Sequence, residues 1–283
     1  MTPLIGGLGA ALGWAGATLF AAASSRRIGG MPTLAWVMLS GFLVTAPIVV
    51  VTGWPHGLDA SAAGWLAIAG AGNVGGLALL YTGMRRAEVG VLASIVSTEG
   101  ALAALIAIAD GERPALLTAV GFVPLAIGVA LVAAPPGMRR QVRVAGRDTA
   151  VALAVGAAVS FGLSLFAAGQ ASQSVPIGWV ALPARLIGVV ILVLALAASA
   201  RPLTSPRLGR LAIGAGVCEV LGALMFAWAA RDGIAVASVV SSQFAALAAV
   251  GAFVLFRERL VGRQVLGVAV LAAGVAMVAL GSA

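Results

Sequence analysis

Long apolar runs recur along the chain, and the charged residues are confined mostly to the short segments between them. A helix needs about 20 apolar residues to cross the roughly 30 Å hydrocarbon core of a bilayer. Ten segments meet this length, with approximate ranges 4–23, 33–53, 63–84, 89–109, 116–134, 149–168, 178–199, 211–230, 234–255 and 264–281. Because each is continuously apolar, whereas the strands of a membrane barrel alternate, the pattern predicts ten transmembrane helices.

The two halves of the chain repeat one another. The tetrapeptide LFAA at Leu19–Ala22 recurs at Leu165–Ala168, 146 residues later (165 − 19 = 146), and Glu112 recurs as Glu258 at the same offset. The serine-rich start of the fourth segment recurs in the ninth at an offset of 144, since Ser97 aligns with Ser241 (241 − 97 = 144). An internal duplication therefore explains the order of the motifs.

The position of the linker divides the chain into two repeats of five helices. We expect a first repeat over residues 1–134, a linker over 135–148 and a second repeat over 149–283. Because five is odd, the second repeat enters the membrane from the opposite side. The predicted fold is an all-α integral membrane protein with two inverted five-helix repeats, an arrangement that places a transport site near the bilayer midplane.

These motifs resemble the drug/metabolite transporter superfamily, specifically its EamA-type branch of ten helices in two repeats. The resemblance rests on the A-S-x-x-S starts of the fourth and ninth helices and on the GERP and RERL endings at Gly111–Pro114 and Arg257–Leu260. Where family members carry a proline inside these helices, this chain has Glu99 and Ala245. The resemblance implies export of small metabolites or amino acids by alternating access.

Composition supports a membrane location and indicates an orientation. The chain has 61% hydrophobic and only 9% charged residues, so it lacks the polar surface that a soluble protein of 283 residues needs. Of its 17 basic residues, all arginine, 14 lie in the loops after odd-numbered segments. The positive-inside rule places these loops in the cytoplasm and both termini outside the inner membrane. This placement explains the net charge of +8 without nucleic acid.

Two acidic residues lie in the middle of predicted spans, Glu99 in the fourth and Glu219 in the eighth. An ionisable group at this depth costs about 2.5–3.5 kcal/mol on insertion scales, so such residues face a protein interior and are functional candidates. We expect them to couple protons or to bind the ammonium group of a substrate. The alternative is a purely structural hydrogen bond to a neighbouring helix.

Polar and aromatic residues at matching depths complete the predicted substrate site. Gln243 stands at the position that aligns with Glu99, and we expect both to line one central cavity. The other candidates are Trp14, Asn73, Tyr81, Ser97, Phe161 and Ser242. For the serines, the alternative is packing between helices, and for Trp14 and Phe161 it is core packing or lipid contact.

Three further features have structural interpretations. Arg185 lies within the seventh span and needs a partner, for which Glu219 is one candidate, or must extend to the interface. The sequence GAGNVG at Gly70–Gly75 formally matches a dinucleotide motif, but without a preceding strand it predicts close helix packing. Glu112 and Arg113, with their counterparts Glu258 and Arg259, are expected to form ion pairs at helix ends.

The favoured function is a gradient-driven transporter of small metabolites, with amino acids as the favoured substrates. Drug or nucleotide-sugar transport by the same fold is the alternative within that class. An intramembrane enzyme is a second class, but the sequence contains no catalytic triad, paired catalytic aspartates or metal cluster, so we expect no catalytic residues, metal or cofactor. A structural or sensor protein is a third class. The expected partners are a small-molecule substrate and the lipid bilayer, with the chain acting as a monomer.

Overall fold

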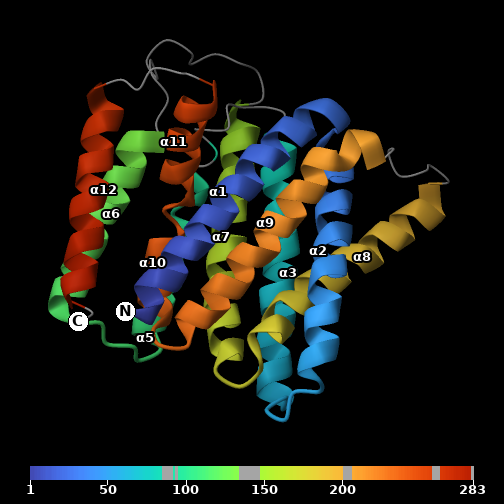
Figure 1. Cartoon of the computed structure of the whole chain (residues 1–283), viewed down its shortest axis with the longest axis horizontal. Helices are drawn as coiled ribbons and strands as arrows, with labels where there is room; N and C mark the ends of the chain where they lie inside the picture. Colours follow the sequence, from blue (N-terminus) through green and yellow to red (C-terminus); the bar gives the residue numbers. More distant parts are fainter. Residues whose placement is uncertain (85–91, 93–94, 134–146, 200–205, 257–261, 282–283) are drawn as a thin grey trace.

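The computed structural model describes residues 1–84, 92, 95–133, 147–199, 206–256 and 262–281 (Figure 1). Residues 135–146 of the predicted linker, Glu258 and Arg259 lie outside these residues, and the last two linker positions belong to a helix that begins at Arg147. Every regular element in the described part is a helix. Six helical segments are long and apolar enough to cross a membrane, namely Thr2–Ile28, Gly30–Thr52, Ala60–Gly83, Thr149–Ser172, Ile177–Leu194 and Gly209–Ala230. The prediction of an all-α membrane protein is confirmed at this level.

The helices of the first half are α1 (Thr2–Ile28), α2 (Gly30–Thr52), α3 (Ala60–Gly83), α5 (Glu99–Ala109) and α6 (Leu116–Ala133). Those of the second half are α7 (Arg147–Ser172), α8 (Ile177–Ser199), α9 (Pro206–Ala230), α10 (Ile234–Ser241), α11 (Phe244–Phe256) and α12 (Gly262–Gly281). Both described chain ends lie at the same end of the bundle (Figure 1).

The fourth and ninth predicted spans are not continuous helices. The chain turns at Ser97–Thr98 before α5 and at Ser242–Gln243 between α10 and α11. At both turns a hydroxyl competes for a backbone carbonyl, because Thr98 Oγ1 donates to Ile95 O at 2.7 Å and Ser242 Oγ donates to Val239 O at 2.8 Å. Such bonds locally replace the regular helical pattern. The apolar pattern missed the turns because they involve only one or two residues.

Helices from the two halves pack against one another in pairs. The helix α1 lies along α9, α3 along α7, and α6 along α12, while α2 packs on α8 and α9. A Cβ added to Gly128 of α6 would lie 2.6 Å from Leu271 Cγ of α12, and one added to Gly274 would lie 2.8 Å from Leu125 Cγ. Higher numbers on one helix therefore meet lower numbers on its partner, so the pair is antiparallel.

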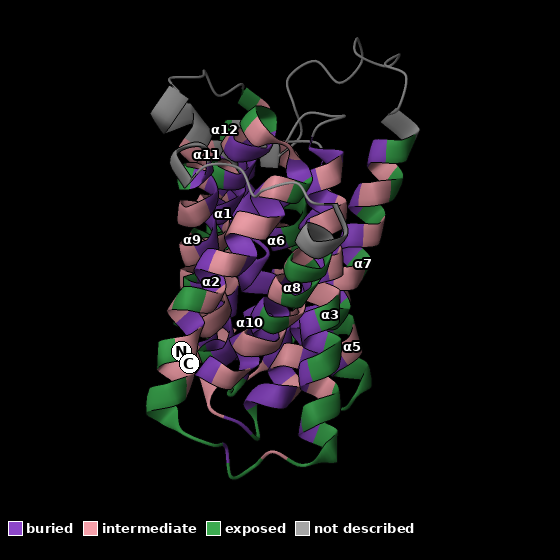
Figure 2. Cartoon of the chain, turned by 90° about the vertical axis from the view of Figure 1, so that its right-hand side faces the viewer, coloured by how far each residue is buried: buried purple, intermediate pink, exposed green. Residues whose placement is uncertain are grey.

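Small residues allow this close approach, as is common between helices in membranes. A Cβ on Gly72 of α3 would lie 2.7 Å from Ser160 O of α7, and one on Gly76 would lie 2.6 Å from the Phe161 ring. The prediction that GAGNVG is a packing motif is confirmed. Buried residues concentrate inside the bundle (Figure 2). Large apolar side chains such as Val51, 87% exposed, lie on the outside.

Candidate substrate cavity

A buried ion pair joins α8 and α9 at the centre of the bundle. Arg185 is only 1% exposed, and its Nη2 lies 3.3 Å from Glu219 Oε1. The helix α2 makes room for the arginine, since a Cβ added to Gly41 would lie 2.9 Å from Arg185 Cδ. Of the two alternatives for Arg185, the structure thus supports pairing with Glu219.

The first half of the chain contributes a third member to this cluster. Asn73 of α3 donates from Nδ2 to Glu219 Oε1 at 3.1 Å, so one carboxylate oxygen receives both the asparagine and the arginine. The guanidinium also contacts Met38 Sδ through Nη1 at 3.6 Å. Because buried charges are tolerated when they are paired and hydrogen-bonded, this network accounts for the two charges at the centre of the bundle.

Next to the network is a small cavity that brings together six of the nine candidate residues. Trp14, Asn73, Tyr81, Glu99, Phe161 and Glu219 all line it. Its volume is about 50 Å³. Ordinary ligand pockets measure roughly 300–1,000 Å³, so the site is closed in this conformation.

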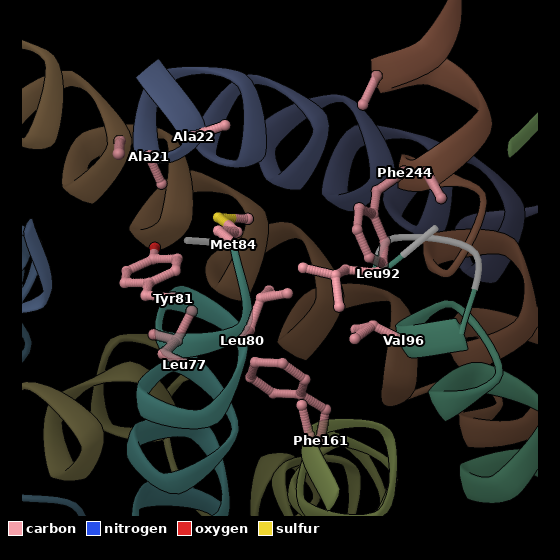
Figure 3. Close-up of a cluster of buried hydrophobic side chains, with 14 of the residues drawn as sticks. Ala21, Ala22, Leu77, Leu80, Tyr81, Met84, Leu92, Val96, Phe161 and Phe244 are labelled. Carbon is pink, nitrogen blue, oxygen red and sulfur yellow. The ribbon is translucent and has the colours of Figure 1, made fainter. Parts of the chain in front are cut away.

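Apolar side chains from several helices form the rest of the wall. Leu77 and Leu80 come from α3, Phe244 begins α11, and Val96 lies just before the turn that leads into α5. These side chains surround Tyr81 and Phe161 in the close-up of Figure 3. The arrangement combines apolar walls with a few fixed polar groups, which is the general character of small-molecule sites.

Several polar atoms around the cavity have no protein partner. Trp14 Nε1, a donor, and Asn73 Oδ1, an acceptor, are both buried without a hydrogen bond. Glu99 is 4% exposed, and no described residue forms a hydrogen bond or ion pair with its carboxyl group. An unpaired buried polar group costs about 1–3 kcal/mol, so these atoms favour a polar ligand or ordered water in the cavity.

The remaining three candidates lie in a different cavity. Ser97, Ser242 and Gln243 line a space of about 250 Å³ between α5, α6 and α10, which we call the lateral cavity. The expectation that Glu99 and Gln243 share one cavity therefore has to be corrected. Val96 and Glu99, three positions apart, face the central cavity, while Ser97 faces the lateral one.

A polar vestibule opens at the end of the bundle where the chain termini lie. It has a volume of about 570 Å³ and is lined by residues that include Asp110, Glu112, Arg113, Arg231 and Asp232. Glu112 does not form the expected local ion pair. Its carboxylate accepts hydrogen bonds from the backbone amides of Ile234 and Ala235 at 3.1 Å, at the start of α10. A carboxylate there complements the unpaired amides of the helix N-terminus.

Arg185 lies at the centre of the bundle but was not among the substrate-site residues predicted from the sequence. The signal was available, because it is the single arginine that falls inside a predicted span. What the sequence does not give is the rotation of α8 and α9, which decides whether the guanidinium meets Glu219 or a lipid headgroup. Within the described part of the chain, no cluster of three potential metal ligands occurs.

Comparisons with known proteins agree with this architecture. The model of the EamA-like transporter family matches residues 1–134. Among 28 matching chains of solved structures, a crystal structure of a protein aligns with a TM-score of 0.74 over 98% of this chain and 96% of that chain, at 16% identity. At that identity, the likeness shows the fold alone. No curated protein matches the sequence.

The family match over residues 1–134 agrees with the resemblance to the drug/metabolite transporter superfamily.

Proposed function

From this resemblance to the EamA-like transporters, we propose that the chain is a gradient-driven exporter of small metabolites, specifically amino acids, which works by alternating access across the inner membrane. The observation that carries the proposal is the central cavity. It lies between helices of both halves, it is closed, and it holds an acidic residue and two buried polar atoms that have no protein partner.

The helix pairing supports an inverted repeat. The contact of Gly128 with Leu271 becomes the contact of Gly274 with Leu125 when 146 is added to the first-half number and subtracted from the second-half number. Asn73 and Glu219, which are hydrogen-bonded, also differ by 146 (219 − 73 = 146). Contacts of this kind are expected next to a pseudo-two-fold axis. An inverted repeat of two five-helix units can exchange the conformations of its halves and so open one site to each side in turn.

The chemistry of the cavity favours a zwitterion with an apolar body. The Glu99 carboxylate and Asn73 Oδ1 can accept hydrogen bonds from an ammonium group, and Trp14 Nε1 can donate to a carboxylate. Arg185 adds positive charge behind Asn73 and Glu219. Leucine, valine and phenylalanine side chains then suit the apolar part of the solute. Drugs and nucleotide sugars are less compatible with a site of this polarity.

The closed cavity implies a conformational cycle. At about 50 Å³ the central site must expand to admit an amino acid, whereas the vestibule of about 570 Å³ is already open. We propose that the vestibule lies outside, because the arginines at the other end, such as Arg26, Arg27 and Arg210, face the cytoplasm under the positive-inside rule. The protein then acts as a monomer with both termini outside.

Orientation can be tested by cysteine labelling in intact cells. Single cysteines at Ser282 and Gln141, in a Cys218→Ser background, are exposed to an impermeant maleimide. Ser282→Cys should react and Gln141→Cys should react only after the membrane is permeabilised. The opposite pattern would contradict the proposed orientation. It would not test the proposed role of the central cavity.

Transport is tested with purified protein in proteoliposomes. A panel of labelled amino acids is offered with and without a pH gradient, and initial rates are compared with those of protein-free liposomes. We expect saturable transport of one or more small apolar amino acids. The Trp14→Phe variant removes the unpaired donor, and Trp54→Phe, at an exposed tryptophan outside the cavity, serves as its matched control. Absence of saturable transport for every amino acid overturns the substrate class.

A further inference from the structure

The lateral cavity has features of a second binding site. It is lined by α5, α6, the end of α10 and the turns at Ser97–Thr98 and Ser242–Gln243. Its volume is about 250 Å³. The central cavity has different lining residues throughout. We propose that the lateral cavity binds a small uncharged amphiphile, such as an aliphatic alcohol, that enters from the bilayer and donates a hydrogen bond to Gln243.

The polar floor of the cavity offers acceptors. Gln243 uses its Nε2 group to donate to Val239 O at 2.8 Å, while its Oε1 atom is buried and has no partner. Ser242 Oγ also donates to Val239 O, at 2.8 Å, and Thr98 Oγ1 donates to Ile95 O at 2.7 Å. Each of the two hydroxyls has committed its single donor to the backbone, and Gln243 Oε1 is an acceptor without a partner, while Gln243 Nε2 keeps a second N–H. A ligand that supplies an O–H group can satisfy Gln243 Oε1.

The walls of the cavity determine the rest of the ligand. They consist of alanine, leucine, isoleucine, valine and phenylalanine side chains, and among the described residues no charged side chain lines the space. A charged ligand would lack a counter-ion in these surroundings, which disfavours ammonium and carboxylate compounds. An apolar chain that ends in a hydroxyl group fits both the walls and the floor.

The rim of the cavity indicates how a ligand arrives. Leu105 is 65% exposed and Ile108 40%, and both line the cavity on the outer side of α5. Large exposed apolar side chains at this depth face lipid in a membrane protein. A compound dissolved in the bilayer can reach the floor between α5 and α6 without crossing the aqueous vestibule.

Binding is tested by photolabelling in lipid nanodiscs, a measurement that does not depend on transport or on the proposed function. The probe is a short aliphatic alcohol with a diazirine on its chain, and labelled residues are identified by mass spectrometry. We expect labels on the inner residues of α5 and α6, with competition by unlabelled alcohol and much weaker competition by the alkane of equal length.

Two substitutions and a matched control decide the outcome. Gln243→Leu removes the acceptor and should reduce labelling roughly threefold to tenfold, the effect of one lost hydrogen bond. Ala126→Phe fills the cavity and should abolish labelling, whereas Ala272→Phe, at the aligned exposed position on α12, should leave it unchanged. Equal labelling in Ala126→Phe, equal competition by the alkane, or labels spread over all lipid-facing helices would overturn the proposal.

Discussion

The central and lateral cavities lie on opposite sides of the turn before α5 and differ in the chemistry of their polar groups. The central cavity borders an ion pair, the acid Glu99, an unpaired donor at Trp14 and an unpaired acceptor at Asn73. The lateral cavity is larger, yet its polar groups offer acceptors and its walls are apolar. Volume alone would select the lateral cavity for the substrate. We propose the central one because it holds ionisable side chains, which are costly inside a membrane and therefore mark functional candidates.

The largest effect is expected from breaking the central ion pair. Arg185→Leu leaves the Glu219 carboxylate buried with only Asn73 as a partner, and loss of one member of a buried pair costs about 3–5 kcal/mol. The variant should unfold at a markedly lower temperature in detergent and lose transport.

A double variant separates stability from function. Arg185→Leu with Glu219→Leu removes both charges and should recover most of the thermal stability without recovering transport. Arg210→Leu, an exposed arginine at the start of α9, is the matched control and should behave like wild type. Normal transport by the double variant would show that the ion pair serves only the fold.

Glu99 should produce the next largest effect. Glu99→Gln keeps the size and part of the hydrogen-bonding capacity of the side chain, so the variant should reach the membrane at normal levels. Glu99→Ala should reduce the initial rate of transport about tenfold or more, because it leaves a polar group of the substrate without a hydrogen-bond partner. If Glu99→Gln loses accumulation driven by a pH gradient and retains exchange, Glu99 couples protons. Wild-type accumulation and exchange in both variants would leave Glu99 a structural residue.

A smaller effect is expected from the free donor of the central cavity. Trp14→Phe keeps the aromatic ring that packs on Phe226 but removes Nε1, so KM should rise roughly threefold to tenfold with little change in maximal rate. Trp54→Phe should leave KM unchanged. Initial rates over a range of substrate concentrations give both parameters, and equal KM values for the two variants would remove Trp14 from the site.

The smallest effect on transport should come from the lateral cavity. Because Gln243 lies outside the central cavity, Gln243→Ala should change the initial rate by less than about threefold, the value of a weak hydrogen bond. A loss as large as that of Glu99→Ala would mean that the two residues meet the substrate together in another conformation, and would restore the shared site that the sequence suggests.

The central site could be anticipated from the sequence in part. The insertion cost of a charge singled out Glu99 and Glu219. The turns could not be anticipated, because the hydrogen bonds that Thr98 and Ser242 donate to backbone carbonyls break the helix within an uninterrupted apolar run.

The apolar pattern also did not predict which helices pack against one another. Mean hydropathy identifies a span but is nearly the same all round it, so it does not tell which side of α8 faces α9. The sequence therefore indicates how deep Arg185 lies in the membrane but not which neighbouring helix its side chain faces. The same limit applies to Glu112, whose position at a helix end was predicted, whereas its contact with the start of α10 required the packing of the two halves.

The most direct test of the central claim is accessibility of the central cavity from both sides of the membrane. Thr18 lines that cavity and is 8% exposed, so Thr18→Cys in a Cys218→Ser background reports on its opening. Oriented proteoliposomes are treated with an impermeant thiol reagent on either side, with and without a transported amino acid. The account predicts slow labelling from each side and protection by the amino acid. Labelling from one side only, or labelling that the amino acid leaves unchanged, would contradict it.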